Sequence, residues 1–134
     1  MYQYMTLTQP KPTVYVSGAI SGVDAVIARA EFALAEKEAK QLFPDCDVFN
    51  PYKVGAVLPG EWTYEQIMNL DLAVLEDCCA IYMIDGWPAS RGATIEHKFA
   101  KEHNIEIVYQ KDYENELNYR MEHPVKHHRD YIEY

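Results

Sequence analysis

The sequence predicts an α/β protein, a three-layer sandwich with a doubly wound parallel sheet of four to five strands between layers of helices. The chain has 134 residues, the length of one domain, and its hydrophobic fraction of 49% and charged fraction of 25% are those of globular proteins. Short apolar runs typical of buried strands alternate with longer segments whose apolar residues recur at helical spacing. Because this alternation favours a parallel sheet with right-handed crossovers, we expect a flavodoxin- or Rossmann-like fold.

The first half of the chain contains two expected strands around one helix. Residues 13–17 are β-branched and aromatic and predict a buried strand, and the glycines of residues 18–22 predict a turn after it. A helix follows to about Leu42, and residues 47–50 form the second strand. Segment 51–61 holds prolines and glycines without a period and is expected to be a loop. The apolar residues that indicate the helix are Val23, Val26, Ile27, Ala30, Ala33 and Leu34.

The second half repeats this pattern. Residues 62–77 have apolar positions at helical spacing, and residues 79–84 form a continuous apolar run typical of a central parallel strand. A third helix over 93–103 and a fourth strand over 105–109 complete the alternation. Beyond Gln110 charge, Tyr and His dominate, and we expect a tail that could include one helix and pack on the domain or on a neighbouring subunit.

The domain is expected over residues 13–109, between an N-terminal segment 1–12 and the tail 110–134.

Composition and charge exclude several classes of function. The 12 basic and 21 acidic residues give a net charge of −9 without a basic cluster, so binding to polymeric nucleic acid is not expected. No apolar run approaches the ~20 residues of a membrane span, which argues against membrane insertion.

The cysteines and the N-terminus favour the cytoplasm. The three cysteines are odd in number and form no CxxC pair, and the first residues lack the features of a secretory signal. Neither a dinucleotide fingerprint, an HExxH motif nor a Cys/His quartet is present. We therefore expect no cofactor and no metal.

Two carboxylates stand at helix positions that should face inward. Asp71 falls on the apolar stripe of helix 62–77, where a carboxylate loses hydration unless a partner compensates. Glu96 stands between Ala93 and Phe99 near the start of the next helix, where the helix dipole favours the ionised form. We therefore expect Asp71 to hold a proton and Glu96 to release one. The alternatives are a rotated helix with Asp71 at the core edge and a Glu96 that only helps to cap its helix.

Further candidates lie at the expected carboxyl ends of the strands, where parallel sheets bind ligands. Gly18 and Ser21 belong to the first turn, whose backbone amides could approach an anionic or hydroxyl-rich ligand. Ser90 is a candidate N-cap, and with Gly92 it would offer a hydroxyl and free amides. The Tyr15 hydroxyl could reach a carboxylate, although a strand Tyr more often packs. The turn after the third strand adds three candidates, of which Trp87 could stack on a planar ring: Asp85, Trp87 and Arg91.

Tyr15, Gly18, Asp71 and segment 90–96, in this order at the expected strand ends, resemble the nucleoside 2-deoxyribosyltransferase family. The segment has the sequence Ser-Arg-Gly-Ala-Thr-Ile-Glu, and the resemblance covers residues 13–109. It looks nearest to the small phage and bacterial members, and the chain is also similar to the 2'-deoxynucleoside 5'-phosphate N-hydrolases. The resemblance implies an enzyme of the bacterial or host cytoplasm that cleaves or transfers at the N-glycosidic bond of 2'-deoxynucleosides or their 5'-monophosphates.

The resemblance also implies residue roles. Glu96 would attack the anomeric carbon, Tyr15 would hold Glu96 in place, and Asp71 would supply a proton or hydrogen bond to the base. The intermediate would be a covalent glycosyl ester, resolved by water or by a second base with retained stereochemistry.

The resemblance leaves the 5'-phosphate open. Ser90 stands where the transferases usually have Asp and the phosphate-requiring hydrolases have Ser, which favours a monophosphate. Those hydrolases carry a Ser and an Arg in the first turn, whereas this chain has Ala19 and Ser21 there. Arg91 could compensate.

Two classes of function remain for such a pocket, and a purely structural subunit is a third possibility if Asp71 and Glu96 face solvent on opposite sides of the domain. The leading hypothesis is the enzyme, and the alternative is a non-catalytic module that binds or senses a nucleotide in the same pocket, because fold alone does not decide function. In either case the resemblance implies a homo-oligomer, a dimer or larger, with the C-terminal tail at the subunit interface.

Overall fold

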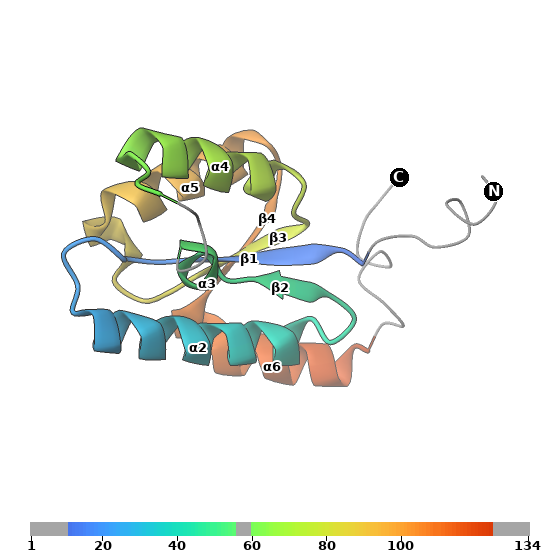
Figure 1. Ribbon diagram of the computed structural model, residues 1–134. Helices are drawn as coiled ribbons and strands as arrows, with labels where there is room; N and C mark the ends of the chain where they lie inside the picture. Colours follow the sequence, from blue (N-terminus) through green and yellow to red (C-terminus); the bar gives the residue numbers. More distant parts are fainter. Residues whose placement is uncertain (1–10, 56–59, 125–134) are drawn as a thin grey trace, which may run out of the picture.

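Four parallel strands form one sheet, and helices cover both of its faces (Figure 1). The computed structural model describes residues 11–55 and 60–124. The sheet has the order β2-β1-β3-β4, so the chain changes direction across the sheet between β1 and β3. Open parallel sheets bind ligands beyond the carboxyl ends of the strands at such a point. The strands are β1 (Thr13–Ser17), β2 (Asp47–Phe49), β3 (Ala80–Met83) and β4 (Glu106–Tyr109).

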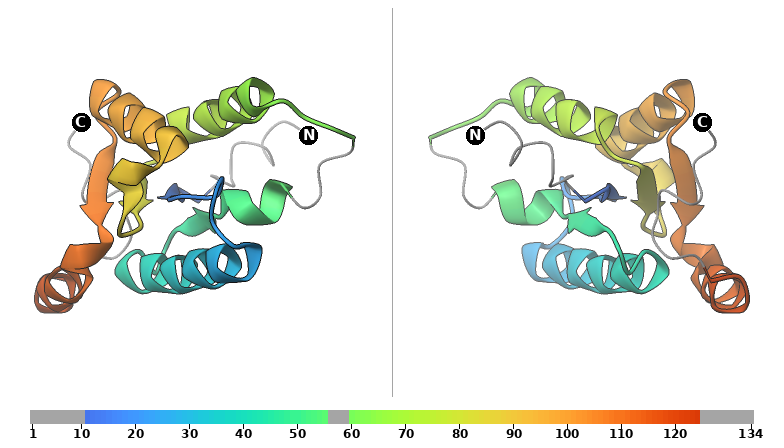
Figure 2. Two further views of the ribbon diagram at one scale, coloured as in Figure 1. Left: turned by 90° about the vertical axis from the view of Figure 1, so that its left-hand side faces the viewer. Right: turned by 90° about the vertical axis from the view of Figure 1, so that its right-hand side faces the viewer.

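The helices complete a three-layer α/β sandwich of the flavodoxin or Rossmann type, as the sequence predicts. Helices α2 (Ala25–Leu42) and α6 (Tyr113–Glu122) lie on one face, and α4 (Tyr64–Glu76) and α5 (Arg91–Glu102) lie on the other (Figure 2). Two short 3-10 turns, η1 (Trp87–Ala89) and η2 (Gln110–Asp112), follow β3 and β4.

Strand β1 divides its side chains between the two cores. Val14 and Val16 belong to the core under α2, whereas Tyr15 belongs to the core under α4 and α5. Successive side chains of a strand point to opposite faces, so Ser17 lies on the same face as Tyr15. The same face of β1 therefore presents two hydroxyl groups toward α4 and α5.

Helix α2 buries a different face from the one that its bulkier apolar residues suggest. Of the residues that indicated this helix, Val26, Ile27 and Leu34 are exposed. The sequence is apolar on two sides of this helix, so periodicity alone cannot decide which side packs. Three small alanines on the buried face let the backbone approach the sheet closely, and Phe32 and Leu42 fill the core between them. The buried residues of α2 are Ala28, Phe32, Ala35, Ala39 and Leu42.

The expectation of a loop over residues 51–61 was wrong at its start. Helix α3 (Pro51–Gly55) begins directly after β2, with Pro51 in the first position, where proline suits a helix. The Asn50 side chain accepts from the backbone N–H of Tyr52 at 3.0 Å, and the Tyr52 hydroxyl donates to the carbonyl of Ala25 at 3.0 Å. Residues 56–59 of the expected loop lie outside the described residues.

The first part of the C-terminal segment forms η2 and α6. Its partly buried Tyr113 and Leu117 pack against the core under α2. Residues 1–10 and 125–134 lie outside the described residues, so the domain boundaries stay a prediction. No helix in the described ranges is both long and apolar enough to cross a membrane.

Candidate functional site

Glu96 lies at the centre of a buried polar cluster between the sheet and helix α5. Its side chain is 5% exposed and accepts two short hydrogen bonds. The Tyr15 hydroxyl donates to Oε2 at 2.5 Å, and the Ser17 hydroxyl donates to Oε1 at 2.6 Å. Because each carboxylate oxygen has its own donor, the orientation of the Glu96 carboxylate is fixed from β1.

Helix α5 carries Glu96 on its inward face. Ser90 is the N-cap, as its position predicts, and its Oγ accepts from the backbone N–H of Ala93 at 3.2 Å. Ala93 and Ala100 are buried on the same stripe as Glu96, so the helix comes close enough to the sheet for a glutamate to reach β1. The first turn of α5 also packs on α4, since a Cβ at Gly92 would stand 3.5 Å from the Tyr64 hydroxyl.

Asp71 reaches the same cluster from helix α4. A capping box of Thr63 and Gln66 starts this helix, and its buried stripe consists of Met68, Asp71 and Leu75. Asp71 is 7% exposed. It lies close enough to Tyr15 and Glu96 for its charge to add to the rise that burial causes in the pKa of both groups. The two inward-facing carboxylates of the sequence analysis thus lie in one electrostatic cluster.

Burial raises the pKa of both carboxyl groups. The pKa of Glu96 rises to about 7 through burial, although the hydrogen bonds from Ser17 and Tyr15 lower it. Burial raises the pKa of Asp71 to about 6. The pKa of Tyr15 lies far above its ordinary value because of burial and the charge of Glu96. This hydroxyl therefore stays protonated and acts as a hydrogen-bond donor to Glu96.

The expected division of protons between the two carboxyls was therefore wrong for Glu96. The helix-dipole argument favoured an ionised Glu96, but removal from water outweighs the dipole at this depth. Near neutral pH Glu96 therefore competes for a proton at least as strongly as Asp71 does.

Four of the other predicted residues border the cluster or the start of α5. Gly18 follows β1 in a place where a Cβ would stand 2.8 Å from Cδ1 of Ile84, so the close packing of the β1 and β3 ends requires glycine. The Arg91 guanidinium carbon lies 5.0 Å from the centre of the Tyr64 ring, which holds this cation beside α4. Ser90 and Gly92 lie in the first turn of α5 itself.

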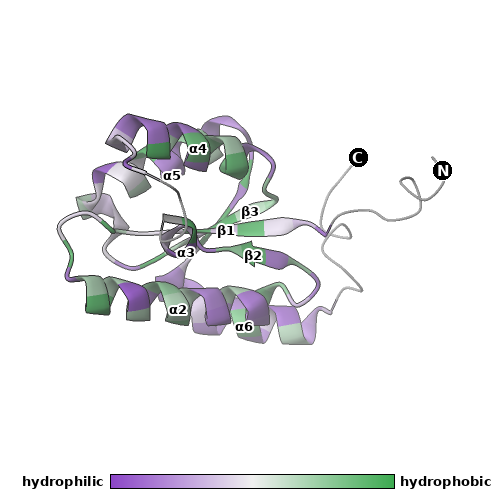
Figure 3. Ribbon diagram, viewed as in Figure 1, coloured by the Kyte–Doolittle hydropathy of each residue, from purple (hydrophilic) through white to green (hydrophobic). Residues whose placement is uncertain are grey.

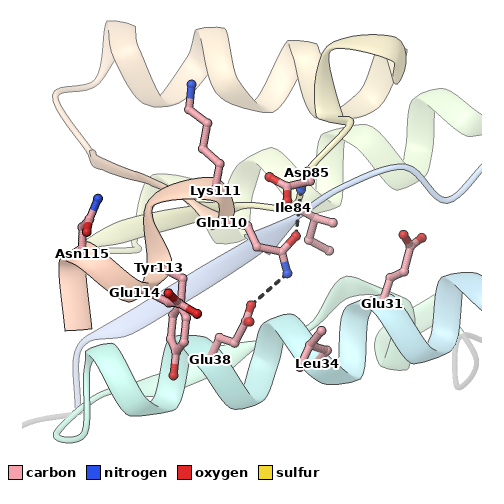
Figure 4. A pocket seen from close by; sticks show the side chains of 10 residues that line it. All are labelled: Glu31, Leu34, Glu38, Ile84, Asp85, Gln110, Lys111, Tyr113, Glu114 and Asn115. Atoms are coloured by element: carbon pink, nitrogen blue, oxygen red, sulfur yellow. Dashed lines mark hydrogen bonds between the residues drawn. The ribbon is translucent and has the colours of Figure 1, made fainter. Parts of the chain in front are cut away.

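Asp85 and Trp87 follow β3 and line one pocket together with Met83 and Tyr109. Asp85 lines a groove between α2 and the start of α6, on the opposite face of the sheet (Figure 4). The Trp87 ring stacks on His97, with the ring centres 4.1 Å apart, and lies against Tyr109. Stacking of Trp87 on a ligand ring therefore stays a prediction, with one contact surface of the ring already occupied by His97.

The first turn offers fewer amides than its glycines suggest. Asp24 caps α2, and its Oδ1 accepts from the backbone N–H groups of Val26 and Ile27 at 2.9 and 3.2 Å. The Asp24 carboxylate at the start of this helix repels an anionic ligand. Ser21 is exposed in the turn before it.

Ser17 was not among the predicted site residues. The available signal was the alternation of β1, because a side chain two residues after Tyr15 must point to the same face. A metal is not indicated either: no cluster of three or more His, Cys, Asp or Glu side chains suited to a metal occurs within residues 11–55 and 60–124.

One protein family matches the chain. The family described as Domain of unknown function (DUF4406) matches residues 12–109. The chain belongs to this family. The DUF4406 region contains all four strands, both helices of the site and every member of the Glu96 cluster. No curated protein matches the chain, and no solved structure matches it.

The cluster of the DUF4406 domain combines the groups needed for acid-assisted displacement. Glu96 can act as an oriented nucleophile when it is ionised, and Asp71 can donate a proton when it is neutral. Tyr15 and Ser17 both donate to the Glu96 carboxylate, so they hold it in place and stabilise its negative charge.

Proposed function

We propose that this chain is an enzyme that cleaves the N-glycosidic bond of 2'-deoxynucleosides or their 5'-monophosphates and passes the sugar to water or to a second base. The observation that supports this proposal is the buried Glu96 carboxylate, held by two hydroxyl donors and accompanied by a second carboxyl, Asp71. Retaining glycosidic cleavage uses such a pair, one group as nucleophile and the other as acid.

In the first step a Glu96 oxygen attacks C1' of the sugar and the C1'–N bond breaks. The bond electrons leave with the base, which takes a proton from Asp71. The product is a glycosyl ester of Glu96. Water or a second base then attacks C1' and gives up a proton to the Asp71 carboxylate, the ester bond breaks, and the Glu96 carboxylate is restored with the original stereochemistry at C1'.

The hydrogen bonds at Glu96 serve both steps. The sugar passes through an oxocarbenium-like state whose positive charge an adjacent carboxylate stabilises. Tyr15 and Ser17 keep the carboxylate in one orientation, so less ordering is needed when the substrate binds. They also stabilise the departing carboxylate when the ester breaks.

The start of α5 is the better candidate for a 5'-phosphate. The helix N-terminus and the Arg91 cation both favour an anion there, and Ser90 adds a hydroxyl. The start of α2 opposes an anion because Asp24 already occupies its amides. These features favour a monophosphate over a nucleoside.

The test is base release from deoxynucleosides and deoxynucleotides, with and without an acceptor base, followed by chromatography. We expect release by the wild-type chain and by Glu102→Gln, an exposed control on the same helix, and none by Glu96→Gln. A glycosyl adduct on the protein should appear in intact mass after rapid quenching. Tight binding of a nucleotide without any product, unchanged in Glu96→Gln, would instead establish a binding or sensing module.

A further inference from the structure

Helix α2 exposes an apolar stripe on the side away from the sheet. Val26, Ile27 and Leu34 are 77%, 55% and 51% exposed, and Ala30 and Ala33 are exposed between them. We call these five residues the outer stripe. At about 100° per residue they lie opposite the buried face of α2. In Figure 3 hydrophobic segments recur along the length of this helix. A helix that is apolar on two sides has a second surface to bury.

The two edges of the outer stripe carry opposite charges. Arg29 lies on the edge toward α3, whereas Glu31 and Glu38 lie on the edge toward α6. Within the described part of the chain neither Arg29 nor Glu31 has an ion-pair partner. The acidic edge continues into the groove of Figure 4, which has a volume of about 560 Å³. Its lining includes four carboxylates and one lysine: Glu31, Glu38, Asp85, Glu114 and Lys111.

We infer that the outer stripe binds a second copy of this chain, with the two α2 helices parallel to each other about a two-fold axis. A symmetric dimer uses the same patch on both subunits, so the patch must be complementary to itself. About an axis parallel to the helices, the Arg29 edge of each helix faces the Glu31 edge of the partner. Two equivalent ion pairs then flank the apolar contact.

The antiparallel arrangement lacks this complementarity. About an axis perpendicular to the helices each edge meets its own copy, which brings arginine to arginine and glutamate to glutamate. Like charges across an interface are unfavourable. Because Ala30 at the middle of the outer stripe is small, the axes of the two α2 helices can approach to about 8–10 Å. A crossing angle between the helices keeps the lysines in the later turns of one α2 away from those of the other.

The acidic groove extends the contact beyond the stripe. Three helical turns alone bury too little for a stable dimer, which needs roughly 800 Å² on each partner. In the parallel arrangement the basic edge of the partner lies over the opening of the groove beside Glu31. The interface would then use α2 and the start of α6 from both copies.

This inference does not rest on the proposed function. The outer stripe lies on the opposite face of the sheet from the Glu96 cluster. Its variants therefore test assembly alone, and base release tests the site alone.

The experiment measures the mass of the full chain in solution by light scattering and sedimentation, at concentrations up to tens of micromolar. We expect wild type to have the mass of two chains and Leu34→Glu that of one. Ala73→Glu, an exposed position on α4, is the matched control and should stay dimeric. Circular dichroism confirms that each variant is folded.

A charge exchange tests the orientation. Arg29→Glu alone and Glu31→Arg alone should each raise the dimer Kd at least about tenfold, and the double variant should restore it, because each reversed edge again meets its opposite. A monomeric wild type, a dimeric Leu34→Glu or a double variant weaker than both single variants would overturn the inference.

Discussion

Replacement of Glu96 by glutamine should stabilise the folded chain at alkaline pH while it removes activity. Glu96 has an ordinary pKa of 4.5 and a pKa of about 7 in the folded protein. Below pH 4.5 the side chain is neutral in both the folded and the unfolded chain, so it adds no pH-dependent cost. Between 4.5 and about 7 the folded chain binds more protons than the unfolded one, and the free energy of unfolding falls as pH rises.

The magnitude follows from the difference between these two values. At about 1.4 kcal/mol for each pH unit, ionised Glu96 costs roughly 3 kcal/mol at pH 8. Glutamine is neutral at every pH, and its amide can keep both hydroxyl contacts when one of the hydroxyls turns to accept. We therefore expect Glu96→Gln to exceed wild type by roughly 3 kcal/mol at pH 8 and to match it at pH 4.

The assay is urea unfolding followed by circular dichroism from pH 4 to pH 8. Glu102→Gln, exposed on the same helix, serves as the control and should follow wild type throughout. A Glu96→Gln chain that is equally stable or less stable than wild type at pH 8 would refute the reasoning, because Glu96 would then ionise without cost.

The other predictions concern the same cluster and the turn after β1. In steady-state assays Ser17→Ala should lower kcat about 10- to 100-fold with little change in KM, because a hydrogen bond to a charged group contributes about 1.5–3 kcal/mol. Ser17→Thr keeps the hydroxyl and should recover most of the loss. The pH profile of kcat/KM should be bell-shaped, with apparent pKa values near 6 and 7. Asp71→Asn should remove the fall in kcat/KM at alkaline pH. If the fall persists in this variant, another residue is the acid. Gly18→Ala should destabilise the chain by about 1–3 kcal/mol in urea unfolding, because the new Cβ meets Cδ1 of Ile84, and Ile84→Val should recover part of this loss.

The layers of the fold were predictable from the sequence because its two central strands are strongly marked: β1 is β-branched and aromatic, and β3 is a continuous apolar run. β3 is buried along its whole length, which a run such as residues 79–84 indicates without any alternation. Helix boundaries were less predictable. Helix α3 depends on the Asn50 side chain and on the contact of Tyr52 with Ala25, and no local pattern indicates such a contact.

The placement of Asp71 and Glu96 followed from helical spacing, but their proton affinities did not. Spacing gives the direction of a side chain, whereas a pKa depends on how much water remains around it once three elements have packed. The same limit explains α2, where two apolar stripes compete and only the packed structure shows which of them faces the sheet. Ser17 was within reach of the alternation rule, since Tyr15 was already a candidate.

Because the side chains of β1 alternate between the two faces of the sheet, the register in which β1 pairs with β3 matters for the Glu96 cluster as well as for packing. In the observed register Tyr15 pairs with Ile81 and Ser17 with Met83. A shift of this strand by one residue would exchange its two faces, so that both hydroxyl groups would point into the core under α2 and two valines would point toward the carboxylate. A chain with such a slip would lose both hydrogen bonds to Glu96 and bury two hydroxyl groups among apolar side chains, so the register that packs the two cores also holds the carboxylate in place.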